Sequence, residues 1–323
     1  MYFEGVNVCV YGLNRSLGVT AHSIEEKILK PLRLISKETH FRAAFNVTAS
    51  GEFSSQRSGE GLSLIGDDQQ KLLPDFQIQL VDQDAFDNQF NLSDILVHGD
   101  HYQDNGGSVQ NMMRALHALQ RCYESIPRCA RESFPTIFVR PDLDIIDDID
   151  IEFLLSHANG DSIIVPGWQF FGGVNDRFAI SAAGKASDAY AERFRTVVEY
   201  LQLTSRPFHS ESYLFDVLNL RRIHILPIVQ TRFVRVRAGK SLHPETIQHE
   251  HLQPVASAES WSLLTQQLMT MHRRLREAGE RIASLKLAQG ALEHKVQTLK
   301  QTIQDCKRKV KRLRGKVKLL KEQ

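Results

Sequence analysis

Hydrophobic and polar positions alternate along residues 1–237 with two different periods. Short apolar runs rich in β-branched and aromatic residues predict strands, and between them apolar residues recur every three or four positions, which predicts helices. This order of elements is typical of an α/β domain built around a mostly parallel sheet. The predicted strands are residues 6–11, 41–47, 77–81, 136–140, 162–166, 177–181, 223–229 and 233–236.

Three predicted helices have a recognisable start or apolar face. Ser23 and Glu26 form a capping box, which predicts a helix from Ser23 towards Leu34. Ser108 is placed to cap a second helix, because apolar residues share one face after it. A third helix is predicted from an apolar stripe at Tyr190, Phe194, Val197, Val198 and Leu201.

The segment 49–66 is rich in Ser and Gly. We expect either a plain loop here or a lid that orders over a ligand. Residues 238–260 are polar, contain two prolines and keep no period, so they are interpreted as a linker.

From Trp261 to the C-terminus, apolar residues recur at alternating steps of three and four over eight heptads. β-Branched residues fill most of one core position and leucine most of the other, which favours a parallel two-stranded coiled coil. Gln289 would then be the polar core residue that fixes the register. The alternative is one long helix folded back on its own domain. The two core positions hold Leu268, Leu275, Ile282, Gln289, Val296, Ile303, Val310 and Val317, and Met271, Ala278, Leu285, Leu292, Leu299, Cys306, Leu313 and Leu320.

Charge is unevenly distributed between these regions. The net charge is +2, but residues 261–323 hold 16 Lys and Arg against 5 Asp and Glu, whereas residues 1–260 hold 24 against 33. Nine cations lie between Lys307 and Lys321, mostly outside the apolar seam. Such a strip attracts an anionic membrane or an acidic polymer, or it is simply a solvated helix face. No helix-turn-helix or zinc-finger pattern favours nucleic acid.

The composition rules out several classes of protein. Of 323 residues, 42% are hydrophobic and 24% are charged, which excludes a disordered or collagen-like chain. No apolar run approaches the roughly 18 residues of a membrane-spanning helix, and no basic leader precedes the first strand. The four cysteines form no Cys-x-x-Cys pair, so neither a disulfide framework nor a structural zinc site is expected. We expect a cytoplasmic protein, at most peripheral at the inner face of the membrane.

Candidate chemistry lies where strands end, because open α/β sheets bind ligands at the carboxyl edge of their strands. The first strand leads into a turn that contains Gly12, Arg15 and Ser16 and precedes a helix. Backbone amides and a guanidinium in such a turn suit a phosphate or a base.

The strand 136–140 leads into Asp142 and Asp144. In an extended chain these carboxylates point the same way and could share one divalent cation, while Arg140 could offset phosphate charge. The alternative is an acidic solvated turn, because further aspartates follow.

An aromatic and glycine-rich loop follows the strand 162–166. Trp168, Phe170 and Phe171 beside Gly172 and Gly173 offer aromatic walls and close backbone approach, a common way to hold a sugar ring, although a buried structural turn is the alternative. The polar residues that come next are Asn175, Asp176 and Arg177.

His209 and Glu211 stand at the head of an apolar, helix-like run. His209 is a further candidate metal ligand, and Glu211 could orient it or cap the helix. Another polar cluster precedes the helix that begins near Ser108, and we expect it in a loop near the edge of the sheet that would bind the ligand. It consists of His98, Asp100, His101 and Asp104.

In their order and spacing, these four strand ends resemble the GT-A class of nucleotide-sugar-dependent glycosyltransferases, in particular uncharacterised bacterial ones associated with capsular and lipopolysaccharide loci. The resemblance covers roughly residues 6–237. It implies an α/β fold with a GT-A-like, Rossmann-type mixed sheet flanked by helices, followed here by the long C-terminal coiled-coil helix. The implied activity is metal-assisted transfer of a sugar from a nucleotide-sugar donor to a glycan or lipid-linked acceptor in surface polysaccharide synthesis.

The resemblance also assigns roles to residues. Asp142, Asp144 and His209 would hold Mn²⁺ or Mg²⁺ on the donor diphosphate, and Asp176 would be the catalytic base. The donor would contact Gly12, Arg15, Ser16, Arg140 and Asp142, and the acceptor would contact Trp168, Gly172, Gly173, Asn175, Arg177 and Glu211. The acidic pair of the family is Asn175-Asp176 here, and Arg-Pro precedes Asp-Leu-Asp, so either aspartate, or Arg140 with Asp142 alone, could be the equivalent of the metal-binding motif.

Two other functions remain open. The stretch from Gly12 to Thr20 is similar to the phosphosulfate-binding turn of sulfotransferases, which would use phosphoadenosine phosphosulfate and no metal. The chain could also be a coiled-coil assembly protein whose α/β head has lost catalysis. The expected organisation is a catalytic domain at 1–237, a linker at 238–260 and a basic coiled coil at 261–323 that forms a homodimer or a higher oligomer.

Overall fold

The computed structural model describes residues 2–48, 52–55, 60–64, 69–228, 231–236 and 242–245, together with eight single positions nearer the C-terminus. The chain divides into two compact units, residues 1–270 and 271–323. The eight C-terminal positions are all helical: Arg281, Leu285, Gln289, Lys300, Gln301, Gln304, Lys307 and Arg308. The other heptad positions lie outside the described residues, so the coiled coil and the dimer stay predictions.

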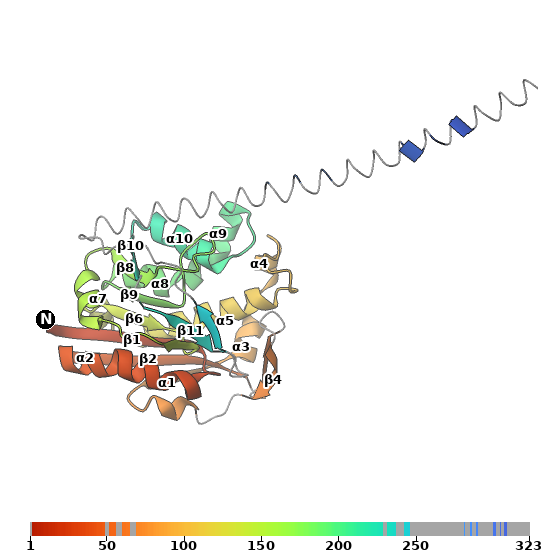
Figure 1. Ribbon diagram of the computed structural model, residues 1–323. Coiled ribbons are helices and arrows are strands. Elements are labelled where there is room, and N and C mark those ends of the chain that lie inside the picture. The colour runs from red at the N-terminus through yellow and green to blue at the C-terminus, as the bar shows by residue number, and fades with distance from the viewer. Residues whose placement is uncertain are drawn as a thin grey trace, which may run out of the picture. The chain divides into compact units, whose positions relative to one another are not determined.

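The main sheet of the described part has seven strands in the order β10-β8-β9-β6-β1-β2-β5 (Figure 1). Neighbouring strands are parallel except for β9, which is antiparallel to both β6 and β8. This confirms the predicted α/β fold with a mixed sheet flanked by helices. The strands are β1 (Phe3–Leu13), β2 (Ser36–Val47), β5 (Gln77–Asp82), β6 (Thr136–Val139), β8 (Ser162–Pro166), β9 (Phe178–Ser181) and β10 (His224–Ile228).

Two small antiparallel sheets accompany it. In one, β11 (Phe233–Val236) pairs with β7 (Leu143–Ile145) and β12 (Leu242–Glu245). In the other, β3 (Glu52–Ser55) pairs with β4 (Glu60–Leu64). Thus β12 lies in the segment that was interpreted as a linker, and the segment 49–66 contains two paired strands where a loop or a lid was expected. Its remaining residues lie outside the described part.

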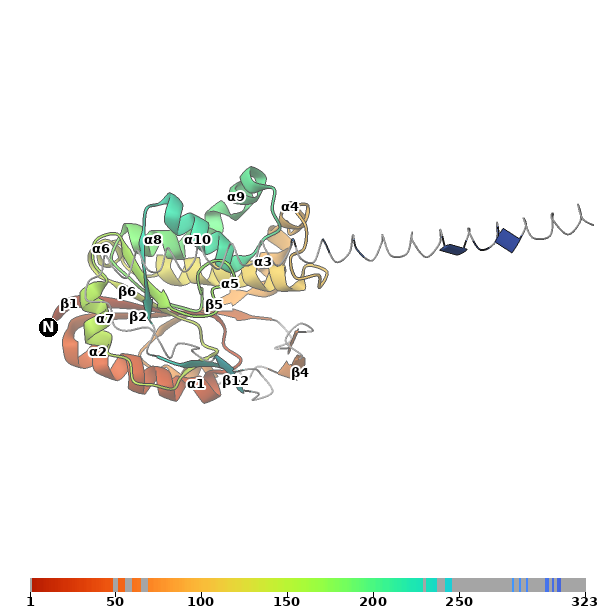
Figure 2. The ribbon, with the colours of Figure 1, turned by 45° about the horizontal axis from the view of Figure 1, so that its top comes forward.

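Helices cover both faces of the main sheet (Figures 1 and 2). Alternate residues of β1 explain why: Val6, Val8 and Val10 join one apolar cluster, and Cys9 and Tyr11 join the other. One face carries α1 (Leu17–Ile24), the π-helix η1 (Glu25–Leu29), α2 (Lys30–Ile35) and α7 (Ile151–His157). The other carries α5 (Gly107–Glu124), α6 (Arg128–Ser133), α8 (Lys185–Ala191), the 3₁₀-helix η3 (Arg193–Thr196), α9 (Val197–Thr204) and α10 (Ser210–Leu220).

Three shorter helices lie between β4 and α5 in the sequence. They are the 3₁₀-helix η2 (Gln69–Leu72), α3 (Gln83–Gln89) and α4 (Ser93–Leu96). Among the residues that the structure describes, no helix combines the length and the apolar character needed to cross a membrane.

Two predicted helix starts are wrong. Helix α1 begins at Leu17, so Ser23 is not a cap; its hydroxyl donates to the Thr20 carbonyl at 3.0 Å and accepts from the Ile145 amide at 3.1 Å. Helix α5 begins at Gly107, and the Asp104 carboxylate caps it by accepting from the Ser108 amide. At Ser23 a tertiary contact with the Ile145 amide replaces the predicted cap, whereas at Ser108 a carboxylate four residues earlier in the chain takes the capping role.

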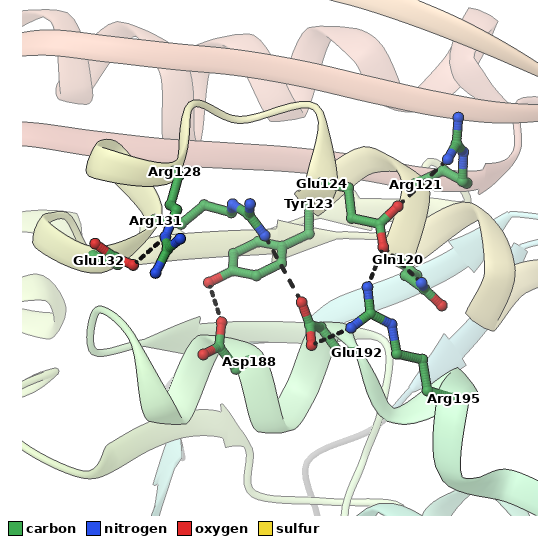
Figure 3. Close-up of polar contacts among 10 residues, drawn as sticks. All are labelled: Gln120, Arg121, Tyr123, Glu124, Arg128, Arg131, Glu132, Asp188, Glu192 and Arg195. Carbon is green, nitrogen blue, oxygen red and sulfur yellow. Dashed lines mark hydrogen bonds and ion pairs between the residues drawn. The ribbon is translucent and has the colours of Figure 1, made fainter.

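The predicted third helix is divided into α8, η3 and α9. A polar network holds α8 and η3 against α5 and α6 (Figure 3). Arg195 bonds Glu124 at 2.6 Å and Glu192 at 3.1 Å, and the Tyr123 hydroxyl donates to Asp188 at 2.8 Å. This network fixes the segment that supplies Tyr190 and Arg193 to the candidate site.

Candidate functional site

The candidate site lies at one edge of the main sheet, where several chain segments meet. Strands β1, β6 and β8 run in the same direction, so their carboxyl ends share this edge, and the antiparallel strand β9 begins there. Arg15 therefore follows β1, Arg140 follows β6, and the loop before β9 reaches the same edge. The Arg140 amide donates to the Arg177 carbonyl at 3.1 Å, which joins two of the predicted strand ends directly.

Arg140 and Asp142 form the central ion pair. The Arg140 Nε donates to Asp142 Oδ1 at 3.0 Å, and its Nη2 donates to Oδ2 at 2.7 Å. On the other side, Arg15 Nη2 lies 3.8 Å from the same Oδ2. The Asp142 side chain is only 3% exposed, whereas that of Arg140 is 30% exposed. A bidentate contact of this kind holds the guanidinium plane in a fixed orientation.

The surrounding charges keep Asp142 ionised. Burial by itself would raise the pKa of Asp142, but Arg140 and Arg15, with a further contribution from Arg235, outweigh it and lower the pKa to about 2. Burial would also lower the pKa of Arg140, yet Asp142 and Asp176 raise it. The pair is therefore charged at every physiological pH.

Asp176 is the second buried carboxylate of the site. Its Oδ2 accepts a short hydrogen bond from the Ser210 hydroxyl, and its backbone carbonyl accepts from the hydroxyls of Tyr11 at 2.9 Å and Tyr190 at 2.8 Å. Burial alone would raise the pKa of Asp176, but Arg140 and Arg193, followed by the Ser210 hydrogen bond, lower it. An ionised carboxylate is thus held in a fixed position next to the Arg140–Asp142 pair.

Sequence reasoning missed Arg193. Its side chain is fully buried, its guanidinium lies 4.3 Å from the centroid of the Tyr190 ring, and its Nη1 donates to the Tyr190 carbonyl. Arg193 lies within the segment that predicted the third helix, and an arginine in a helix is ordinarily exposed, so no local signal distinguished it.

The site as a whole carries more positive than negative charge. The guanidinium groups of Arg15, Arg140, Arg177, Arg193 and Arg235 act on the two carboxylates Asp142 and Asp176. This excess of positive charge suits an anion.

The loop between β8 and β9 differs from the expected acceptor wall. Trp168 is 4% exposed and stacks on Phe233 with ring centroids 5.4 Å apart, so it belongs to the core. The Asn175 amide donates to the Trp168 carbonyl at 3.0 Å and its Oδ1 accepts from the Arg177 amide at 3.1 Å. Arg177 donates to the Gln169 side chain at 2.5 Å. Trp168, Asn175 and Arg177 therefore shape the loop from inside.

Phe171 is the aromatic residue of this loop that reaches solvent. It is 52% exposed and has a φ of 44°, in the left-handed region that bulky residues rarely adopt. Gly172, with a φ of 83°, continues this conformation, and Gly173 allows close packing because a Cβ there would lie 1.9 Å from the Glu211 carbonyl oxygen. Strained positions of this kind often occur at ligand sites.

His209 and Glu211 form one pair at the start of α10. His209 is the N-cap: its Nδ1 accepts from the Ser212 amide at 3.3 Å, and its Nε2 lies 3.3 Å from Glu211 Oε2. An accepting Nδ1 leaves the proton on Nε2, which then donates to Glu211. The predicted metal ligand is thus engaged in capping, and the predicted acceptor contact Glu211 holds its ring.

The polar cluster before α5 meets this pair through His101, whose ring centroid lies 4.5 Å from that of His209. Asp100 has a structural role, since its carboxylate accepts from the amides of Tyr102, Asp104 and Gly106. The structure thus places this loop beside the start of α10, and its proximity to a donor stays a prediction.

The turn after β1 does not present its hydroxyl groups to a ligand as the sequence predicted. Gly12 has a φ of 114°, which a glycine adopts without strain. The Ser16 hydroxyl donates to the Val236 carbonyl at 2.8 Å, and the Thr20 hydroxyl donates to the Pro141 carbonyl at 2.6 Å. Ser16 therefore anchors β11 and does not face a phosphate.

The proposed metal ligands do not fit a divalent cation. Both oxygens of Asp142 are engaged by Arg140, and both ring nitrogens of His209 are engaged at the start of α10. Asp144 lies on β7 opposite Val234. Among the described residues, no three His, Cys, Asp or Glu side chains are grouped so as to hold a metal ion.

Comparison with known proteins gives little further information. No protein-family model and no curated protein sequence matches this chain. Among solved structures, the chain is similar to the apo form of mouse xyloside xylosyltransferase 1, with 12% sequence identity and a TM-score of 0.34. The match covers 70% of this chain and 85% of the mouse chain.

Proposed function

We propose that this chain is a glycosyltransferase that moves a sugar from a nucleotide-sugar donor to a glycan or lipid-linked acceptor, in surface polysaccharide synthesis. One observation carries the proposal: the pair of half-buried Arg140 and buried Asp142, flanked by Arg15, lies with Asp176 at the carboxyl edge of a mixed α/β sheet. That edge is where open α/β sheets bind nucleotides, and guanidinium groups are suited to diphosphates. The GT-A resemblance of the sequence agrees with both.

In the proposed reaction, the bond between the anomeric carbon of the sugar and the diphosphate oxygen breaks, and the nucleoside diphosphate leaves with the electron pair. The acceptor hydroxyl oxygen forms the new bond to that carbon. The guanidinium groups of Arg15 and Arg140 stabilise the negative charge that develops on the leaving group.

Asp176 would take the proton of the acceptor hydroxyl if the transfer inverts the anomeric centre. Its lowered pKa keeps it ionised, and the hydrogen bond from Ser210 holds the carboxylate in place. If the transfer retains the configuration, Asp176 would instead orient the acceptor. The exposed ring of Phe171 and the backbone at Gly172 would contact the acceptor sugar ring.

The sulfotransferase alternative loses its main support. It needs hydroxyl donors in the first turn, and the hydroxyls of Ser16 and Thr20 donate to backbone carbonyls of the protein. The excess of guanidinium groups around two ionised carboxylates favours an anion-binding site over a non-catalytic assembly protein.

The tail is proposed to form a homodimer and to bring the enzyme to the inner face of an anionic membrane through residues 307–321. A truncation after Ala258 tests this. We expect the truncated protein to be monomeric in sedimentation and to bind anionic vesicles less than the full chain does. A dimer with unchanged vesicle binding would exclude this role.

Calorimetric titration with a panel of nucleotides, nucleotide sugars and phosphoadenosine phosphosulfate, with and without Mn²⁺ or Mg²⁺, tests the main proposal. One nucleotide sugar should bind, and it should then be consumed in the presence of a glycan acceptor by the wild type but not by Asp176→Asn. Binding of the phosphosulfate alone would replace the proposal with a sulfotransferase, and no binding across the panel would favour an assembly protein.

A further inference from the structure

We infer that the donor diphosphate is held by the guanidinium groups of Arg140 and Arg15 in place of a divalent cation, and that Asp142 positions Arg140 and does not ligate a metal. This inference rests on the proposed function and names how that same site binds its substrate. It departs from the role that the sequence resemblance gave to Asp142.

Arginine side chains occupy both carboxylate oxygens of Asp142. Each of its oxygens accepts a hydrogen bond from Arg140, at 3.0 and 2.7 Å, and the second also faces Arg15 at 3.8 Å. To bind Asp142, a divalent cation would have to displace the bidentate contact from Arg140, at an Asp142 side chain that is only 3% exposed. It would also enter a region that already carries an excess of positive charge.

The other candidate metal ligands, His209 and Asp144, do not form a cation site in place of Asp142. His209 is held by the Ser212 amide and by Glu211, at 3.3 Å from each. Arg140 ties Asp142 to the end of β6, and Asp144 lies on β7, where Leu143 and Ile145 on either side of it are buried. Alternation along the strand directs Asp144 to the opposite face from these two neighbours.

Arg140 has N–H groups left that can donate hydrogen bonds to an anion. Its Nε and Nη2 are bonded to Asp142, which leaves Nη1 with no protein acceptor among the described residues. The Arg140 side chain is 30% exposed, and Nη1 does not belong to the buried polar atoms that lack a partner among the described residues, so this donor has access to solvent. A guanidinium fixed in this way presents its remaining N–H groups to a phosphate without first losing conformational freedom.

The charges support the same arrangement. A divalent cation in a nucleotide-sugar site neutralises the diphosphate, and Arg15, Arg140 and Arg235 around one carboxylate supply a net charge of similar size. Removing the metal should therefore change diphosphate binding little, whereas removing Arg140 should change it greatly.

The test is calorimetric titration of the full chain with inorganic pyrophosphate and with the nucleoside diphosphate of the donor, in EDTA and in Mn²⁺. We expect dissociation constants within about threefold of each other in the two buffers. Arg140→Gln should weaken binding at least tenfold. Arg140→Lys should restore only part of the binding, because the lysine ammonium lacks the planar, bidentate donor geometry of a guanidinium. Asp142→Asn should retain binding within tenfold, since the anion does not contact the carboxylate through a metal.

Arg128→Gln is the matched control, because Arg128 is an exposed arginine that pairs only with Glu132 among the described residues. Circular dichroism and thermal unfolding establish which variants fold. If Arg140→Gln does not fold, Arg15→Gln gives the same comparison.

The outcomes separate the inference from the proposed function. Binding that requires Mn²⁺ and disappears in Asp142→Asn would overturn the inference and leave the glycosyltransferase standing. Binding of pyrophosphate in EDTA without binding of any nucleotide sugar would support the guanidinium site and remove the glycosyltransferase. If the folded wild type binds neither pyrophosphate nor a nucleotide, both fail.

Discussion

Gly173 packs against the backbone of Glu211 so closely that a Cβ on Gly173 would lie 1.9 Å from the Glu211 carbonyl oxygen. The Val174 amide donates to that same carbonyl at 2.9 Å. The contact fastens the loop before β9 to the start of α10, and so brings Asp176 within reach of Ser210.

Gly173→Ala should therefore destabilise the protein, because backbone on both sides would have to move. We expect a loss of about 3 kcal/mol in the free energy of unfolding, measured by urea denaturation. Gly18→Ala is the control: Gly18 lies in α1 with no atom within 4 Å of an added Cβ, and alanine there should stabilise the helix by about 0.5 to 1 kcal/mol. Equal stability of the two variants would contradict the packing described.

Two neighbouring arginines should differ sharply in their contribution to stability. Arg193 is buried beside Asp176, whereas the Arg195 side chain is 54% exposed and pairs with Glu124 and Glu192. Arg193→Ala removes one of the guanidinium charges that stabilise the buried Asp176 carboxylate, together with a fully buried side chain, and should cost about 3 kcal/mol. Arg195→Ala should cost less than about 1 kcal/mol. Chemical denaturation of both variants decides this, and a comparable loss in each would be inconsistent with a buried role for Arg193.

The roles of Asp176 and Ser210 can be separated by kinetics. Asp176→Asn should reduce kcat for sugar transfer by about a hundredfold or more if Asp176 is the base. Ser210→Ala removes a hydrogen bond that lowers the pKa of Asp176, so the acidic limb of the pH profile of kcat/KM should move to higher pH. Asp148→Asn, at a carboxylate that is 91% exposed, should leave the rates unchanged. An unshifted acidic limb in Ser210→Ala would show that Asp176 does not control it.

Asp142 should contribute to the pH dependence of stability. Its pKa falls from an ordinary 3.8 to about 2 on folding, so its stabilising contribution is complete above pH 4 and is lost as the pH falls towards 2. Lowering the pH from 6 to 2.5 should reduce the stability difference between wild type and Asp142→Asn by roughly 1 to 2 kcal/mol. Urea denaturation at several pH values measures this difference. A constant difference would mean that Asp142 is not paired in the folded state.

Phe171 should be tested by two substitutions that both remove the ring. Phe171→Gly also relieves the left-handed backbone, which should increase stability by about 1 kcal/mol, whereas Phe171→Ala should not. If the ring contacts the acceptor, both variants should raise the KM for the acceptor about equally and leave the KM for the donor unchanged. An unchanged acceptor KM in both would remove Phe171 from the site.

Local patterns in the sequence predicted most strands well. Apolar runs such as 162–166 coincide with β8, because a strand buried on both faces is mostly apolar. The strand-end rule also located Arg15, Arg140, Asp142 and Asp176, which the structure brings into one network. Short elements such as β7 were missed, since a three-residue strand carries too little pattern to detect.

The environment of each residue was harder to predict. Trp168 and Phe171 stand three positions apart in one aromatic loop, yet the first is in the core and the second is exposed. Ser23 and Ser16 carry hydroxyls suited to capping or phosphate binding, but distant carbonyl and amide groups engage them instead. Arg193 had no local signal, because its partner Asp176 comes from a different segment.

The sequence by itself determined the α/β class, the positions of the strands and the edge at which the charged residues gather, because these follow from the period of apolar residues and from the direction of parallel strands. Only the tertiary structure decided which partner each charged group has. Arg140 stands only two residues before Asp142, but Arg15, which faces the same carboxylate, is brought there by folding, and no local pattern encodes that contact.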